Sequence, residues 1–157
     1  GKKVWPANYN MDGQLVLAGL KADLESLVDT FKAAGAKRAL VLDMSVASHC
    51  ELLQSAVENL KPYLFEFLND EFLDVVSNVS AEVYNTKDEA IEFLSSQLIS
   101  PVKYKQSIKA HDSKVDLYIE FGNGAVLKGL NKKSSEKPTL NVSDMKTLNE
   151  TIEALND

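Results

Sequence analysis

The sequence predicts an α/β protein with two unlike parts, a small β-β-α-β unit over residues 1–46 and a layered α/β core over residues 47–157. Two observations predict the first part: the Asp12-Gly13 dipeptide, which is typical of hairpins, joins two short β-prone runs, and a helical repeat and a third β-prone run follow. A third observation predicts the second part. From Ser48 onward, longer helical repeats alternate with single apolar runs, as in a mainly parallel sheet.

The first part has the element order of the last two-thirds of a ferredoxin-like unit. VWPANYN and QLVLAGL are the expected strands of the hairpin, and Gly35 provides a left-handed end for the helix that follows. KRALVLDM, residues 37–44, is the expected third strand. A complete ferredoxin-like unit starts with one more strand and helix, so the element count suggests truncation. The apolar positions that repeat at helical spacing are Leu20, Leu24, Leu27, Val28 and Phe31.

The second part is expected to begin with a helix that has a capping box. Ser48 and Glu51 fit the S-x-x-E pattern, which makes His49 the first residue of the helix, and Pro62 should kink or end it. Thr86 and Glu89 form a second such box. The helix after it should stop at Pro101, with Gln97 near its end. Further helices are expected over VKYKQSIKA, residues 125–132 and the last repeat; the expected strands are FLDVVSNV, VDLYIEFG and TLNV.

Composition excludes several classes of function. The net charge of −6, without a basic run, argues against a nucleic-acid partner. One cysteine and two separated histidines give neither an internal disulfide nor a zinc-like ligand set, so no metal is expected. No apolar run approaches a membrane span, and the GKK start lacks the apolar part of a signal peptide. We therefore expect a cytoplasmic protein without a membrane partner, whose start was processed, trimmed or engineered because the initiator methionine is missing.

His49 is the main candidate for chemistry. At a helix start, the positive end of the helix dipole keeps imidazole neutral near pH 7, as a general base requires. The simpler interpretation is a histidine that only packs or hydrogen-bonds locally. The neighbouring Cys50 would point about 100° away from it, so we expect a buried, inert thiol rather than an activated nucleophile. No G-x-S-x-G nucleophile elbow occurs, so the base has no evident nucleophile in this chain.

Three other features have simple interpretations. His111 lies among turn-forming residues and is expected at the solvated surface. Gly122 and Gly124 fit a dinucleotide fingerprint, but Leu127 stands where the third glycine should be, which favours tight strand-to-helix packing instead. Two sets of lysines belong either to solvated faces or to a surface that docks an acidic partner, and these are Lys103, Lys105 and Lys109, and Lys132, Lys133 and Lys137.

Several segments in order carry a resemblance that spans nearly the whole chain. SVASHC is similar to an S-V-P-S-H-C-type segment, PANYNMDGQLVLAG to P-V-N-x-N-x-x-G-Q-x-V-I-A-G, and AAGAKRALVL to A-A-G-A-K-R-A-x-x-L; VVSNV, SSQLISPVKY and FGNGAVLKGLNKK follow. In this order they resemble the free-standing malonyl-CoA:acyl carrier protein transacylases of bacterial fatty acid synthesis. The departures are Ala47 for a common proline, Ser77 beside the usual asparagine and Asn123 for the proline of a G-P-G loop, which affect loop geometry only.

The resemblance implies the C-terminal half of such an enzyme. Family members are roughly twice this long, with a ferredoxin-like subdomain and an α/β-hydrolase-like acyltransferase core. The implied reaction moves a malonyl group from CoA to the phosphopantetheine thiol of acyl carrier protein by a Ser-His ping-pong mechanism, without a metal or redox cofactor. The family's G-Q-G-S-Q oxyanion loop, its G-H-S-x-G-E serine and its malonyl-binding arginine lie in the missing N-terminal half. This chain alone is therefore expected to be inactive.

The resemblance also implies roles for individual residues. His49 is the implied general base, and the backbone carbonyl of Gln97 orients its ring, since a carbonyl near a helix end has no intrahelical donor. Ser48 either influences acyl choice or acts only as a cap. An alternative interpretation is a non-catalytic module of the same fold that binds acyl carrier protein or CoA. The residues implied at the substrate entrance are Asn10, Gln14 and Arg38, and those for docking the carrier protein are Lys132 and Lys133.

Overall fold

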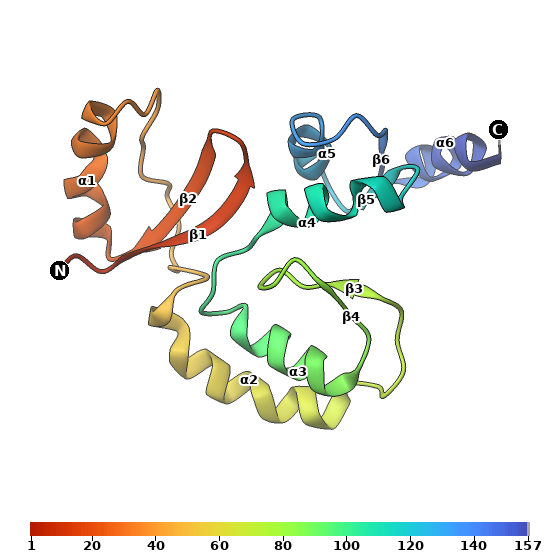
Figure 1. The fold of residues 1–157 in the computed structure, drawn as a ribbon, viewed down its shortest axis with the longest axis horizontal. Helices are drawn as coiled ribbons and strands as arrows, with labels where there is room; N and C mark the ends of the chain where they lie inside the picture. The colour runs from red at the N-terminus through yellow and green to blue at the C-terminus, as the bar shows by residue number, and fades with distance from the viewer. Residues whose placement is uncertain (157) are drawn as a thin grey trace.

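Short sheets and helices alternate along the chain in the computed structural model, which describes residues 1–156 (Figure 1). Within those residues the strands form three two-stranded sheets. The strands are β1 (Val4–Met11), β2 (Gln14–Gly19), β3 (Val75–Val76), β4 (Val83–Tyr84), β5 (Tyr118–Phe121) and β6 (Thr139–Val142). The α-helices are α1 (Lys21–Ala33), α2 (Gln54–Phe67), α3 (Lys87–Ser96), α4 (Tyr104–His111), α5 (Val126–Asn131) and α6 (Met145–Asn156), with 3₁₀ turns at Glu51–Leu53 and Asp112–Lys114.

The first hairpin and helix confirm the sequence prediction. Strands β1 and β2 pair antiparallel, from Val4 opposite Gly19 to Met11 opposite Gln14. Gly13 sits in the turn with φ 80°, a conformation that glycine adopts without the steric cost of a side chain. Helix α1 ends before Gly35, whose φ of 98° is the expected left-handed end.

The predicted strand KRALVLDM is wrong for this structure. Residues 36–50 contain neither a strand nor a helix, and apolar side chains are exposed along them, with Leu42 at 56% and Met44 at 71% of full exposure. A β-strand exists only through hydrogen bonds to a neighbouring strand, and no strand within residues 1–156 pairs with this segment. The observed order of the first part is therefore β-β-α rather than β-β-α-β.

The start of α2 also differs from the prediction. Cys50 is the N-cap of the 3₁₀ turn Glu51–Leu53, and Leu53 is the N-cap of α2. Neither has a side-chain cap, so the capping box predicted at Ser48 is absent. His49 therefore lies outside the helix, because its positive φ of 60° breaks the helical path. Pro62 does not end α2, which continues to Phe67 and packs against α3.

Fewer strands of the core pair in parallel than the sequence predicts. FLDVVSNV contributes only β3, which forms a short antiparallel hairpin with β4. Strands β5 and β6 are the parallel pair, with α5 as the crossover between them, from Tyr118 opposite Thr139 to Phe121 opposite Val142. The expected helices at VKYKQSIKA, at 125–132 and at the end of the chain are confirmed as α4, α5 and α6.

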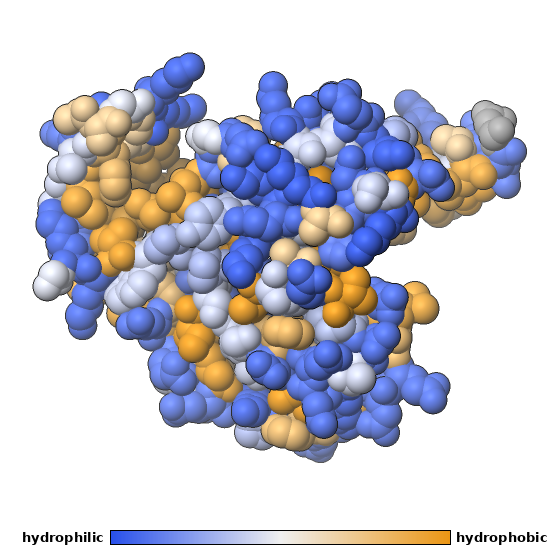
Figure 2. Space-filling view, in the orientation of Figure 1, coloured by the Kyte–Doolittle hydropathy of each residue, from blue (hydrophilic) through white to orange (hydrophobic). Residues whose placement is uncertain are grey.

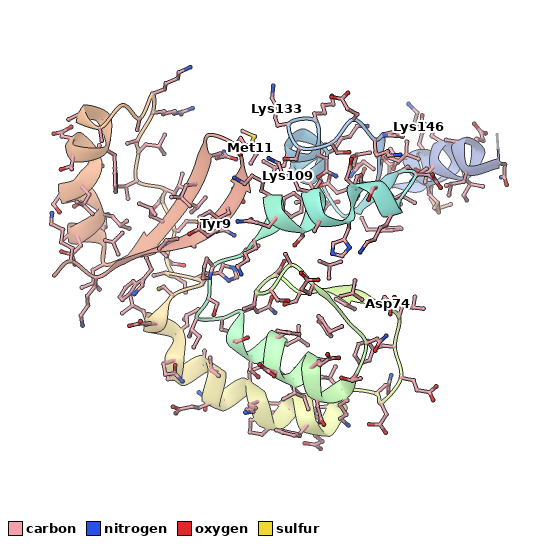
Figure 3. The ribbon with its side chains drawn as sticks, in the orientation of Figure 1. Tyr9, Met11, Asp74, Lys109, Lys133 and Lys146 are labelled. Atoms are coloured by element: carbon pink, nitrogen blue, oxygen red, sulfur yellow. The ribbon has the colours of Figure 1, made fainter. Side chains whose placement is uncertain are left out.

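Hydrogen bonds join the first hairpin to α4 and to the residues just before it. Val102 forms a parallel bridge with β1, in which Tyr9 N–H donates to the Val102 carbonyl and Val102 N–H donates to the Ala7 carbonyl, at 2.9 and 2.8 Å. At the hairpin turn, Asp12 accepts from Lys105 and Lys109 of α4 at 2.9 and 2.8 Å. Figure 3 shows Met11 at this tip beside Lys109. These contacts hold β1 against the start of α4.

Candidate active site

The backbone around His49 is fixed by its buried neighbour. Cys50 is 1% exposed and packs with Ala7 of β1 and Ala18 of β2, and its thiol donates to the Ala47 carbonyl at 3.3 Å. This confirms the expected buried cysteine. A positive φ costs a non-glycine residue roughly 1–2 kcal/mol, so the conformation of His49 persists only because the packing on either side determines it.

The His49 ring reaches the end of α3. Its Nδ1 lies 2.7 Å from the backbone carbonyl oxygen of Gln97, in a partly buried contact. A carbonyl oxygen can only accept, so Nδ1 carries the proton in this contact and the lone pair of a neutral ring is on Nε2. Within residues 1–156 no side chain or backbone group is hydrogen-bonded to Nε2. The geometry leaves Nε2 able to accept a proton from a group outside these residues.

The carbonyl of Gln97 is available because of how α3 ends. Gln97 is the C-cap residue, with its own N–H bonded to Phe93. The residue that would donate to the Gln97 carbonyl in a continuing helix is Pro101, four positions on, and proline has no N–H. The Q-x-x-x-P spacing is therefore a sequence signal for a free carbonyl, and it refines the expectation that the helix stops at Pro101.

The other end of α3 is held as predicted. Thr86 and Glu89 form a capping box with both reciprocal bonds present: Glu89 N–H donates to the Thr86 hydroxyl at 3.4 Å, and Thr86 N–H donates to the Glu89 carboxylate at 3.3 Å. The Thr86 hydroxyl also donates to that carboxylate and lowers the pKa of Glu89. Ala90 and Ile91 are buried along the helix. The cap and the buried face together fix the helix whose C-cap residue, Gln97, contacts His49.

The other candidate residues within residues 1–156 form no hydrogen bond with the ring. Asn10 is half-buried in an irregular part of β1, while Gln14 at the start of β2 and Arg38 in the unpaired segment are exposed. Ser48 is half-buried beside His49. Among residues 1–156, no hydrogen bond joins any of these four side chains to His49. Lys132 and Lys133 are exposed at the end of α5, where Figure 3 labels Lys133.

Two interpretations of the sequence are corrected. His111 is not a solvated turn residue, because it ends α4, is half-buried and hydrogen-bonds through Nε2 to the Ala81 carbonyl at 3.0 Å. Gly122 and Gly124 do not mark tight packing, since an added Cβ at either would meet no atom within 4 Å. Their φ values of 125° and 93° explain the glycines instead.

The predicted lysine face also has a specific partner. Lys105 and Lys109 bind Asp12 rather than projecting freely into solvent. Their hydrogen bonds, first from Lys109 and then from Lys105, lower the pKa of the Asp12 carboxyl from 3.8 to about 2. These two lysines therefore serve an intramolecular contact between α4 and the hairpin.

The sequence interpretation missed Asn78. Its side-chain amide donates to the side-chain oxygen of Gln97 at 3.0 Å, on the residue whose carbonyl holds His49. The VVSNV segment carried the family resemblance, but nothing in its pattern showed which residue it would contact. Within residues 1–156, no group of three acidic, cysteine or histidine side chains could hold a metal ion.

Comparisons with known proteins give one consistent family. No family model matches the chain. Over its whole length it is 39% identical to malonyl CoA-acyl carrier protein transacylase of Bacillus subtilis, of which it covers 50%. Over 99% of its length it is 36% identical to the protein of that name from Haemophilus influenzae, of which it covers 51%. The chain thus spans about half the length of these curated relatives.

Solved structures agree in fold. Malonyl-CoA:acyl carrier protein transacylase from Helicobacter pylori matches with a TM-score of 0.96 and 46% identity, over 99% of this chain and 51% of that one. A type II polyketide synthase acyl-carrier protein in complex with its malonyl-transacylase matches with a TM-score of 0.91 and 34% identity, over 98% of this chain and 51% of that one. The α/β class is therefore confirmed. By sequence and fold, the chain belongs to the malonyl-CoA:acyl carrier protein transacylase family and corresponds to about half the length of its relatives.

Proposed function

We propose that this chain is the C-terminal part of a malonyl-CoA:acyl carrier protein transacylase and supplies the general base of its active site. The contact between His49 Nδ1 and the Gln97 carbonyl is the observation that supports this most, because it selects the tautomer whose Nε2 accepts a proton. In this proposal residues 1–46 are the remainder of a ferredoxin-like subdomain. Residues 47–157 are then the C-terminal part of an α/β-hydrolase-like core.

The proposed reaction is a two-step acyl exchange. A serine of the complementary N-terminal half attacks the thioester carbonyl of malonyl-CoA while Nε2 of His49 takes the hydroxyl proton. The carbon–sulfur bond breaks, and the CoA thiolate leaves with that proton from His49. The carrier protein's phosphopantetheine thiol then gives its proton to Nε2 and attacks the malonyl-serine ester. The serine oxygen leaves and recovers the proton, so the enzyme returns to its starting state without a metal or redox cofactor.

The Gln97 carbonyl takes the role that a carboxylate has in a Ser-His-Asp triad. It accepts from Nδ1–H and so fixes both the tautomer and the orientation of the ring. Being neutral, it stabilises the imidazolium less than a carboxylate would, because it lacks the attraction between opposite charges that a carboxylate supplies. Orientation is therefore its main contribution to the proposed reaction.

Exposed apolar side chains support a complementary half. Leu40, Leu42 and Met44 are exposed on the segment that the sequence predicts as a strand, and Phe121 and Val126 are exposed near β5 and α5. Figure 2 shows hydrophobic side chains among hydrophilic ones on the visible face. Exposed apolar surface of this kind usually contacts another protein segment, and an unpaired strand segment accepts a partner strand readily.

Substrate and partner sites form part of the same proposal. We place Asn10, Gln14 and Arg38 at the substrate entrance, and Ser48 where it influences acyl choice. Lys132 and Lys133 are the proposed docking residues for acyl carrier protein, since they are exposed cations and a related transacylase has been solved with its acyl carrier protein. The reaction is proposed to take place in the cytoplasm.

Replacing each histidine in turn tests the proposal. In a protein that combines this chain with its complementary half, His49→Ala should lower malonyl transfer by roughly 10²–10⁴-fold, the usual effect of losing a general base. His111→Ala is the comparison and should lose about tenfold or less, because it removes one hydrogen bond, to the Ala81 carbonyl, and leaves the contact between His49 and the Gln97 carbonyl in place. Full activity in a folded His49→Ala protein would contradict the proposal. Binding of acyl carrier protein or CoA without any transfer would support the non-catalytic module instead.

A further inference from the structure

Gln97, whose backbone carbonyl contacts His49, also accepts a hydrogen bond through its side chain. The Asn78 side-chain amide donates to Gln97 Oε1 at 3.0 Å, while the Gln97 backbone carbonyl accepts from His49. Asn78 also accepts through its own backbone carbonyl, from Lys103 N–H at 2.8 Å. Asn78 thus binds both ends of the segment 97–103, which leads from α3 into α4.

The Gln97 peptide needs such support. The first bond after it is long, with Leu98 N–H 3.4 Å from the Ser95 carbonyl, beyond the usual range of roughly 2.7–3.2 Å, and the next, from Ile99 N–H to the Ser96 carbonyl, is 3.1 Å. Helix ends open more easily than helix interiors. A rotation of this last turn would swing the Gln97 carbonyl away from His49, and displacements of about 1 Å in a catalytic site can cost 10²-fold in rate.

Asn78 is well suited to provide this support because its own turn is rigid. Ser77 is 2% exposed, and its hydroxyl accepts from the N–H groups of Val79 and Ser80 at 3.1 and 3.2 Å. The N–H of Ala81 donates back to the Ser77 carbonyl, and His111 donates to the Ala81 carbonyl. The turn that carries Asn78 is therefore bonded from within and anchored to α4.

We propose that Asn78 is a positioning residue for His49, which acts by fixing Gln97 so that the Gln97 carbonyl selects the Nδ1–H tautomer. The inference rests on the proposed function for its consequence in catalysis, but the hydrogen bonds that carry it lie wholly within this chain. Among the residues that the structure describes, no hydrogen bond joins Asn78 to the His49 ring. The effect of Asn78 is on how often the ring has the productive tautomer and orientation.

The test uses the two histidines of the chain, His49 and His111, as separate reporters. The chain is labelled with ¹⁵N at histidine, and the tautomer of each ring is read from its ¹H–¹⁵N couplings. In the unsubstituted chain His49 should be mainly the Nδ1–H form. Asn78→Ala should give a mixture of the two tautomers at His49 and leave His111 unchanged. The matched control is Asn85→Ala, which removes an equivalent amide bond, from Asn85 to Asp74 at 3.0 Å, in the same hairpin.

A second variant guards against misfolding of the first. Gln97→Met keeps the backbone carbonyl and the side-chain length but removes the acceptor of the Asn78 bond, so it should reproduce the effect on His49. The double variant should disturb the His49 tautomer no more than either single variant does, because the two substitutions remove the same hydrogen bond. An unchanged His49 in both single variants would overturn the proposal. A change of both histidines together would overturn it as well, since it would show a general loss of the turn.

Activity then gives the separate consequence for catalysis. In a protein with both halves present, Asn78→Ala should lower kcat by about 3- to 10-fold with little change in KM, the scale of one neutral hydrogen bond. Asn85→Ala should leave kcat unaltered. An altered His49 tautomer together with full activity of His49→Ala would mean that the proposed function fails while the positioning contact stands. A change of KM alone would contradict a positioning role.

Discussion

His49 and Gln97 are 48 residues apart in the chain, and the ring of one lies 2.7 Å from the backbone carbonyl of the other. Three features create this contact. Cys50 is buried against the first hairpin and fixes the turn that carries His49, the Thr86 cap holds the start of α3, and Pro101 leaves the last carbonyl of α3 without a helical donor.

Gln97→Ala should cost far less activity than His49→Ala. Alanine keeps the backbone carbonyl that His49 uses and loses only the side-chain bond to Asn78, so a loss of about tenfold or less is expected, against roughly 10²–10⁴-fold for the missing base. Steady-state malonyl transfer by the two variants, with circular dichroism as the folding check, measures the difference. Equal losses in two folded variants would mean that the Gln97 side chain itself takes part in the chemistry.

Pro101→Ala should weaken the contact with His49. The new N–H at position 101 is four residues beyond Gln97 and competes with the His49 ring for the same carbonyl. We expect malonyl transfer to fall by about tenfold or less, because one neutral hydrogen bond is shared or lost. Helix content should not decrease. Transfer kinetics and circular dichroism measure the two effects. Pro138→Ala is the control, since Pro138 precedes β6 and lies outside the α3 end. Equal behaviour of the two proline variants would argue against this account of Pro101.

The sequence predicted those contacts that depend on nearby residues. The Thr86–Glu89 capping box formed, because both partners lie within one helical turn and Ala90 and Ile91 bury the face behind them. The same pattern at Ser48 and Glu51 did not form. The positive φ of His49 separates Ser48 from the helix, and that conformation depends on the packing of Cys50 against β1 and β2, which no local pattern reports.

The predicted elements that failed depend on distant partners. KRALVLDM has a strand's composition but no neighbouring strand within residues 1–156, and strand formation requires that neighbour. His111 appeared to be a turn residue because its carbonyl partner, Ala81, lies 30 residues earlier. The Gln97 carbonyl was predicted to be free from its place near a helix end. Its alignment with His49 was implied only by the family resemblance.

Gly19→Ala should destabilise the fold, while Gly129→Ala should not. A Cβ at Gly19 would lie 2.2 Å from the backbone carbonyl oxygen of Lys3, which cannot move away without disturbing the hairpin, so a loss of about 1–3 kcal/mol is expected. At Gly129, in α5, a Cβ would meet no atom within 4 Å, and alanine in a helix gains roughly 0.5–1 kcal/mol. Urea unfolding measures both. Equal stability of the two variants would contradict the close approach at Gly19.

The contact between Asp12 and α4 should make stability depend on acid pH. Hydrogen bonds from Lys109 and Lys105 lower the pKa of Asp12 to about 2, so its stabilising contribution is complete above its usual pKa of 3.8 and is lost as the pH falls towards 2. Asp12→Asn should therefore differ from the unsubstituted chain at pH 6 and converge with it near pH 2. Thermal unfolding at a series of pH values measures this.

Asp43→Asn is the control for that series. Asp43 is exposed on the unpaired segment, and within residues 1–156 it has no ion pair, so its substitution should leave the pH dependence unaltered. A constant difference between Asp12→Asn and the unsubstituted chain from pH 6 to pH 2 would show that the two lysines do not hold the carboxylate in solution.

The central claim is that this chain supplies a base for a nucleophile carried by its complementary half. The most direct measurement incubates labelled malonyl-CoA with this chain, with the other half and with both mixed, followed by denaturing gel and mass analysis. We expect a stable malonyl ester only in the mixture, attached to the other half, and formed roughly 10²–10⁴-fold more slowly with His49→Ala. Stoichiometric labelling of this chain alone, or equally fast labelling with His49→Ala, would contradict the account.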